Sequence, residues 1–192
     1  MRCYPESNGQ SSTPDACVTD LDVMHDCAPV IVGKIKAGED IPTRPPSKRQ
    51  WRVKSEFTAT ELKERRQTRI NKASGQNVRT FVAGEWTLEY DLAHSGLTQE
   101  VWQAAVLALA DENIQVGKVT KEDAIGAREA EFLALAALEL EAKASHVYAL
   151  FETEGASKAI GAQYLSELLE HAVESGGMGV DELRSKLPSY VL

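Results

Sequence analysis

Two short segments of this chain have the pattern of β-strands, and nearly everything after the second has the pattern of helices. Residues 16–19 form a short apolar run, and residues 78–82 alternate apolar and polar side chains before a glycine. A covered α/β sheet usually has four or more strands. We therefore expect an α/β fold with a short parallel sheet followed by a mainly helical region, and we expect this chain to be part of something larger.

Helical periodicity dominates the rest of the chain. Residues 58–71 are rich in helix formers, with Thr58 or Thr60 as the N-cap, and another helix is expected to begin near Thr87. In contrast, residues 25–54 contain four prolines and little periodicity, which is typical of a long surface excursion. Further helices are expected over residues 98–113, 128–152 and 157–175, with a short closing helix before Pro188.

Charge is distributed unevenly along the 192 residues. The net charge is −8, but residues 34–79 contain thirteen Lys or Arg against five acids, whereas residues 81–192 contain seven against nineteen. An acidic protein with one basic section is compatible with a local contact to nucleic acid, although a solvated charged surface is the commoner explanation.

The compartment follows from what the sequence lacks. No run of about eighteen apolar residues predicts a membrane span, and residues 1–16 lack the apolar core of a secretory signal. Cys3, Cys17 and Cys27 are odd in number and irregularly spaced, which argues against a disulfide framework or a zinc knuckle. The four histidines likewise show no metal-binding spacing and are treated as ordinary. We expect a cytoplasmic protein with no membrane contact.

Two acids, Asp20 and Asp22, follow the first predicted strand directly. If the strand continued, alternation would place both carboxylates on one side and Leu21 on the other. Two like charges so close are unfavourable unless water screens them, they share a proton, or a cation lies between them. Asp22 could instead cap a turn. The pair is thus a candidate cation site at the end of a strand, where α/β proteins place ligands.

Two later segments could join these acids. Thr87 and Glu89 follow the second strand and a turn, and their hard oxygen atoms suit Mg²⁺ or Mn²⁺. Lys158 begins a helix among small residues and could neutralise a phosphate. Glu89 and Asp91 could alternatively be acids that complement a helix dipole, which for Asp91 is the better interpretation.

Taken in order, these segments resemble a known family. The segments are VTDLDV, NVRTFVAGEWTLEYDLA, SKAIGAQYLSELLE and LPSYVL, with WTLEYDLA the most specific. Together they resemble the C-terminal part of the topoisomerase-primase (Toprim) domain of ATP-dependent endonucleases of the OLD (overcoming lysogenisation defect) family, from about residue 14 to residue 192. The resemblance implies a partial Toprim, Rossmann-like domain over residues 14–96, with a basic Pro-rich insertion at about 34–56. It also implies a helical C-terminal part over 97–192, after a disordered N-terminus of residues 1–13.

The resemblance also implies a chemistry, which is metal-dependent hydrolysis of DNA phosphodiesters. Asp20 and Asp22 match the metal-binding D-x-D pair, Glu89 matches the following acid, and Thr87 stands in a Ser/Thr position. Lys158 matches the lysine near the scissile phosphate. The catalytic set would be Asp20, Asp22, Glu89 and Lys158, and Thr87 would join the acids as a metal ligand. Two Mg²⁺ or Mn²⁺ ions about 4 Å apart would clamp the phosphate.

The departures from the family pattern matter equally. The family also uses one or two glutamates on an earlier strand and a preceding ATPase domain, and this chain contains no G-x-x-x-x-G-K-[ST] motif. We therefore expect a fragment with an incomplete two-metal site, in which ATP acts only through a separate ATPase domain or subunit. DNA is the expected partner, and a homo-oligomer is compatible. The alternatives are an inactive remnant, a helical fragment that binds a partner without catalysis or, with less support, another D-x-D phosphotransfer domain such as a phosphatase.

Overall fold

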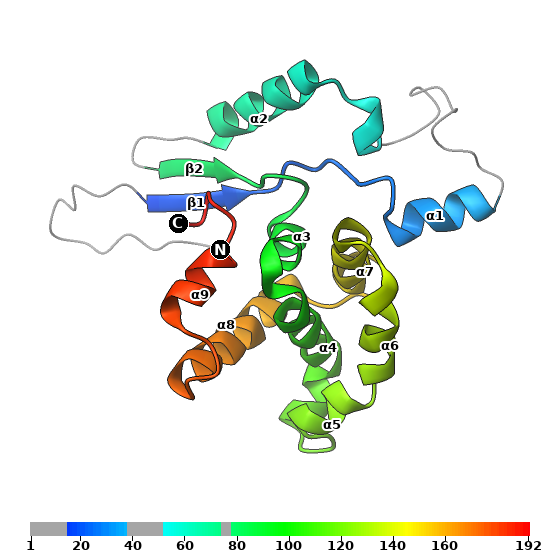
Figure 1. The fold of residues 1–192 in the computed structure, drawn as a ribbon, viewed down its shortest axis with the longest axis vertical. Helices are drawn as coiled ribbons and strands as arrows, with labels where there is room; N and C mark the ends of the chain where they lie inside the picture. The colour runs from blue at the N-terminus through cyan, green and yellow to red at the C-terminus, as the bar shows by residue number, and fades with distance from the viewer. Residues whose placement is uncertain (1–14, 38–51, 74–77) are drawn as a thin grey trace, which may run out of the picture.

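The computed structural model describes residues 15–37, 52–73 and 78–192, and these form a small parallel sheet attached to a larger set of helices (Figure 1). The expected combination of a short parallel sheet and a mainly helical region is confirmed. The expected disordered residues 1–13 and most of the Pro-rich insertion lie outside the described residues. The elements are β1 (Asp15–Thr19), α1 (Pro29–Lys36), α2 (Ala59–Ala73), β2 (Val78–Val82), α3 (Leu88–Leu92), α4 (Thr98–Gln115), α5 (Lys121–Gly126), α6 (Glu129–Ala134), α7 (Leu140–Glu152), α8 (Lys158–Glu174) and α9 (Val180–Ser185).

The two strands pair in parallel, with Asp15 opposite Val78 and Thr19 opposite Val82. Helix α2 covers one side of this sheet, and the other helices except α1 lie on the opposite side (Figure 1). Because the strands are parallel, the segments that leave their carboxyl ends start from the same edge. Under α2, a small apolar cluster joins these segments; it comprises Leu21, Val23 and Val82 with Phe57, Leu62 and Ile70 against them.

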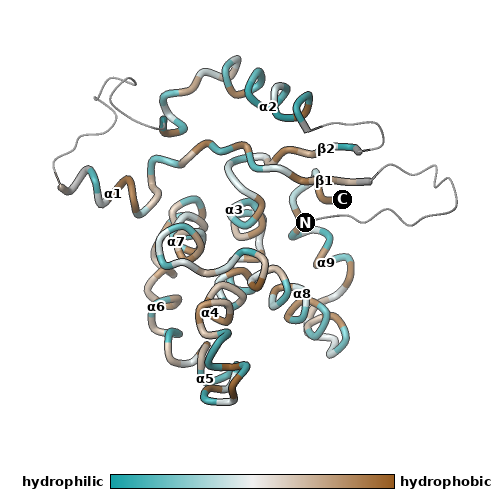
Figure 2. Tube along the Cα trace, turned by 180° about the vertical axis from the view of Figure 1, so that it is seen from behind, coloured by the Kyte–Doolittle hydropathy of each residue, from teal (hydrophilic) through white to brown (hydrophobic). Residues whose placement is uncertain are grey.

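The main core surrounds α4, which packs against both α7 and α8. Figure 2 shows that apolar residues recur along α4 and along the helices around it. Val101, Trp102 and Ala105 of α4 are almost fully buried, and the same core includes Ile31 of α1 and Met178 before α9. The segment after β1 and the C-terminal helices therefore share one hydrophobic core. No helix among the described residues is long and apolar enough to cross a membrane.

Two helical expectations need correction. Residues 29–36 were expected in an irregular excursion but form α1, since proline is well tolerated in a first helical turn and Ile31 is buried in the core. The single helix expected over 128–152 is divided into α6, a 3₁₀ turn and α7. Leu138 has an extended backbone at this break. The break lets the Phe132 ring of α6 pack in a tilted arrangement against Trp102 of α4 while α7 packs separately on α4.

Two predicted helix starts are confirmed by their hydrogen bonds. Thr58 Oγ1 accepts from the Glu61 backbone N–H at 3.2 Å, and the Thr58 N–H donates to Glu61 Oε2 at 2.8 Å. This reciprocal capping box satisfies two backbone groups at the start of α2. Thr87 caps α3 through its side chain, because its Oγ1 accepts from the Tyr90 N–H at 3.2 Å.

A buried carboxylate holds the turn between β2 and α3. Asp91 is 5% exposed and accepts hydrogen bonds from the backbone N–H groups of Gly84, Glu85 and Trp86. Its other partner is the Tyr190 hydroxyl, which donates to Oδ2 at 2.7 Å from the C-terminal segment. Asp91 stands in the first turn of α3, as expected for a helix-dipole acid, but its main role is to fix the preceding turn.

We predict that Asp91→Asn lowers the free energy of unfolding by about 2–3 kcal/mol, because an amide presents an NH₂ group to backbone donors that the carboxylate satisfies. Tyr190→Phe, which removes one of the hydrogen bonds, should cost only about 1 kcal/mol. Urea denaturation followed by circular dichroism measures both changes. An Asp91→Asn protein within about 0.5 kcal/mol of the wild type would contradict this account of the turn.

Candidate functional site

Three of the predicted site residues, from three distant parts of the chain, meet beside the sheet. Asp20 follows β1, Glu89 lies in the first turn of α3, and Lys158 is the first residue of α8. The Lys158 Nζ atom is 3.0 Å from Glu89 Oε2 and 3.6 Å from Asp20 Oδ2. The structure thus brings together two carboxylates and one ammonium group from distant parts of the sequence. Asp20 and Lys158, the outermost of the three, are 138 positions apart (158 minus 20).

Local backbone contacts set the positions of these side chains. The Leu88 N–H donates to Asp20 Oδ1 at 3.2 Å, which ties the start of α3 to the segment after β1. Ser157 caps α8, since its Oγ accepts from the Ile160 N–H at 3.4 Å, and this cap fixes where Lys158 begins the helix. The Lys158 ammonium also lies 5.2 Å from the centre of the Tyr148 ring, a cation–π contact that restricts it from the α7 side.

Burial and neighbouring charges both shift the pKa values of Asp20 and Lys158. Burial raises the pKa of Asp20, and the positive charge of Lys158 opposes this rise while the nearby Glu89 charge adds to it. Burial alone would lower the pKa of Lys158, but its hydrogen bond to Glu89 and the Glu89 charge outweigh burial and raise it. Lys158 is therefore a permanent cation at neutral pH, and it keeps two acids close to each other.

Asp22 points to a different partner from Asp20. The strand ends at Thr19 and Asp22 has a positive φ of 54°, so the alternation expected of a continuous strand does not apply. The Asp22 carboxylate pairs with Arg69 of α2. Arg65 donates to the carbonyl oxygens of Leu21 at 2.8 Å and Asp22 at 2.9 Å, which fixes this backbone from the same helix.

Thr87 is only 2% exposed and its hydroxyl serves as the cap of α3. Of the four residues expected to hold a metal, Asp20 and Glu89 thus form ion pairs with Lys158. Asp22 pairs with Arg69 instead, and the Thr87 hydroxyl accepts from the Tyr90 N–H. The role of the latter two as metal ligands stays a prediction.

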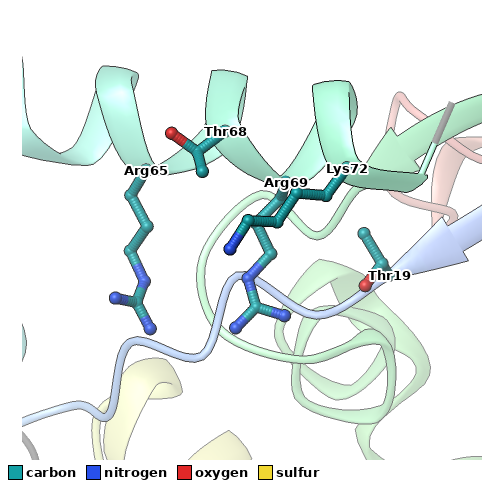
Figure 3. Close-up of a pocket in the computed structure, with 5 residues that line it drawn as sticks. All are labelled: Thr19, Arg65, Thr68, Arg69 and Lys72. Atoms are coloured by element: carbon teal, nitrogen blue, oxygen red, sulfur yellow. The ribbon is translucent and has the colours of Figure 1, made fainter.

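A basic pocket lies between α2 and the end of β1. It has a volume of about 560 Å³ (Figure 3). Figure 3 shows the side chains of Arg65 and Arg69 extending from α2 toward the segment after β1. This part of the expected basic section therefore forms a defined concave surface. The lining residues are Thr19, Arg65, Thr68, Arg69 and Lys72.

One cluster was missed by the sequence reasoning. His25, Cys27 and Glu141 place a ring nitrogen, a sulfur and a carboxylate oxygen within 4.8 Å of one another, and in the described part of the chain this is the only group of three or more such residues that could hold a metal ion. The only sequence signal was the short His25-x-Cys27 spacing, because Glu141 is 116 positions from His25.

No protein-family model, curated protein or solved structure matches this chain.

We predict that Lys158→Met raises the pKa of Asp20 further, because it removes the positive charge that opposes the effect of burial. The pKa of Asp20 in the folded protein is already above its ordinary value of 3.8. The folded state therefore loses stability as the pH rises above 3.8, because ionising Asp20 is harder in the folded than in the unfolded chain. This loss of stability should be larger in the variant. Carboxyl NMR titration of Asp20 measures the shift. Lys121→Met, which removes the Lys121–Glu167 ion pair between α5 and α8, is the matched control. An unchanged Asp20 titration in Lys158→Met would contradict the coupling.

Proposed function

We propose that this chain carries a metal-dependent site for hydrolysis of DNA phosphodiesters, of the kind implied by its resemblance to the Toprim region of OLD-family endonucleases. The observation that carries the proposal is the convergence of Asp20, Glu89 and Lys158 at the carboxyl end of a parallel sheet. Two acids and a lysine in contact are the residue types that phosphoryl transfer needs, since it depends on neutralising charge around a phosphate.

The carboxylates fit a hard divalent cation. Their oxygens are the donors that Mg²⁺ and Mn²⁺ prefer, and both acids already contact one positive charge, the Lys158 ammonium. Asp20 and Glu89 would hold the ion. When bound, it would supply Lewis-acid stabilisation of the phosphate oxygens and lower the pKa of a coordinated water.

The positive charge of Lys158 could also act on a phosphate group of the substrate. Because its contact with Glu89 outweighs the effect of burial on its pKa, Lys158 stays positively charged and can offer this charge to a phosphate oxygen, at a position fixed by the start of α8. If Lys158 turned toward a phosphate, Asp20 and Glu89 would lose the charge that compensates them, and their affinity for a divalent cation would rise. The hydrogen bond from Leu88 keeps Asp20 oriented during such a change.

The basic pocket on α2 supports DNA as the substrate rather than a small phosphate ester. Arg69 and Lys72 project beside the segment that carries Asp20, and Thr19 and Thr68 add hydroxyl groups. Cations and hydroxyl groups of this kind bind the sugar-phosphate backbone without reading sequence. A phosphate backbone that crosses this pocket would reach the acids after β1.

We predict that the purified chain nicks supercoiled plasmid in the presence of Mn²⁺ or Mg²⁺, and that Asp20→Ala, Glu89→Gln and Lys158→Met each reduce the rate at least about 100-fold. Agarose gel assays with and without chelator measure the rate. Lys121→Met and Glu167→Gln are matched controls, since they alter an exposed lysine–glutamate pair between α5 and α8 and should leave the rate unchanged.

Equal plasmid nicking by wild type and Asp20→Ala would overturn the claim of a nuclease site and would favour the inactive or purely partner-binding alternatives. Circular dichroism of each variant separates lost chemistry from lost folding.

We further predict that Lys72→Ala weakens binding to DNA of any sequence and reduces the slope of log K against log salt by about 1, because one phosphate contact is lost. Fluorescence anisotropy in chelator, at several salt concentrations, measures this effect without cleavage. Lys118→Ala is the control, because Lys118 is exposed in the turn between α4 and α5, at the end of the molecule away from α2 (Figure 1). Equal salt slopes for the two variants would exclude the α2 pocket as the DNA contact.

A further inference from the structure

His25, Cys27 and Glu141 form a second polar cluster, on the segment after β1 and the first turn of α7. Their candidate ligand atoms lie within 4.8 Å of one another. None of the three belongs to the Asp20–Glu89–Lys158 site, and the DNA-cleavage proposal gives them no role. We propose that this cluster binds a divalent transition-metal ion, with Zn²⁺ the ion that its donor atoms suit best.

His25 is the most constrained member. It is 1% exposed, its Nδ1 is hydrogen-bonded to Glu141 Oε1, and the Tyr90 hydroxyl lies 3.3 Å from the same nitrogen. The other ring nitrogen, Nε2, is buried and has no hydrogen-bond partner among the described residues. Burying a polar nitrogen without a partner is unfavourable, so this imidazole is incompletely satisfied as it stands.

Cys27 and Glu141 supply the charged donors. Cys27 is partly buried and its Sγ lies 3.3 Å from the Ser145 hydroxyl, one turn along α7 from Glu141. That hydroxyl restricts the direction of the thiol, as outer-sphere groups do around metal ligands. Glu141 is half exposed, which leaves the cluster accessible to an ion from solution.

The donor set distinguishes the metal. A sulfur, an imidazole nitrogen and a carboxylate oxygen are the three ligand types that Zn²⁺ uses, and three protein ligands leave a fourth position for water. Mg²⁺, in contrast, prefers oxygen alone. When the sulfur–metal bond forms, the Cys27 thiol gives its proton to the solvent and binds as thiolate.

The surrounding charge is also suitable. Lys54 Nζ lies 3.7 Å from Glu141 Oε1, which by itself would repel a cation, but the same ammonium is 2.5 Å from Glu85 Oε2. Lys54 and Glu85 therefore compensate each other. The Cys27 thiolate and the Glu141 carboxylate then leave two negative charges, which a divalent ion neutralises.

The protein scaffold around the cluster is well defined. The backbone after β1 is held by a parallel bridge between Met24 and Val53 and by the Lys54 N–H, which donates to the Met24 carbonyl at 2.8 Å. The Asp26 carboxylate also accepts a hydrogen bond from the Ser55 N–H at 3.0 Å. A metal ion would add a link from this held segment to α7, so binding should stabilise the fold.

Co²⁺ is a suitable probe because it replaces Zn²⁺ and is visible in the absorption spectrum. We predict that the purified chain binds one Co²⁺ with a thiolate-to-metal charge-transfer band in the near ultraviolet, that Zn²⁺ abolishes the band by displacement, and that Mg²⁺ does not. Zn²⁺ should also raise the melting temperature. Cys27→Ser should remove the band, and Glu141→Gln should weaken Co²⁺ binding at least about tenfold.

Cys17→Ser is the matched control, since Cys17 is an exposed cysteine on β1, and it should retain the band. Asp20→Ala should also retain it, which separates this site from the nuclease proposal. Cys27 and Glu141 are incompletely buried, so their variants should fold, and circular dichroism of each variant checks this. The proposal is overturned if Co²⁺ gives no thiolate band, or if the band survives Cys27→Ser or is lost in Cys17→Ser.

Discussion

The buried carboxylate of Asp91 is the interaction on which the candidate site depends. This carboxylate accepts hydrogen bonds from three consecutive backbone N–H groups in the turn after β2 and from the Tyr190 hydroxyl in the C-terminal segment. The turn fixed in this way presents the Trp86 carbonyl, which accepts from the N–H groups of Leu21 at 2.9 Å and Asp22 at 3.2 Å. One side chain thereby holds together the start of α3, the segment after β1 and the C-terminal segment, and both acids that contact Lys158 come from these held parts.

Much of this arrangement could be predicted from the sequence, because it follows from local patterns. The strands at 15–19 and 78–82, the Thr58 and Thr87 caps, and α8 starting at Lys158 each have a signal in neighbouring residues. That Asp20, Glu89 and Lys158 could converge was expected from their places after the two strands and at a helix start. Parallel pairing then brings the strand ends to one edge, which is a general property of such sheets.

Other features had no local signal. The positive φ of Asp22 and its pairing with Arg69 depend on contacts from α2, in which Arg69 lies 47 positions after Asp22. The break between α6 and α7 occurs in a sequence of good helix formers, so tertiary packing of Phe132 against Trp102 outweighs local propensity. Asp91 looked like an ordinary helix-dipole acid because its hydrogen-bond donors come from a turn whose shape the sequence does not reveal. His25 looked ordinary because Glu141 comes from α7, 116 positions along the chain.

The two proposed cation sites differ in chemistry but share one short helix. Glu89 and Tyr90 are consecutive residues of α3; Glu89 contacts Lys158, and the Tyr90 hydroxyl contacts His25. Consecutive helical side chains point about 100° apart, because 3.6 residues make one turn. The rotation of α3 about its axis therefore sets both contacts together. An ion that fixed His25 against Glu141 would restrict Tyr90, and through it the position of Glu89 against Lys158. A soft-donor site could in this way support the geometry of a hard-donor site without sharing any ligand with it.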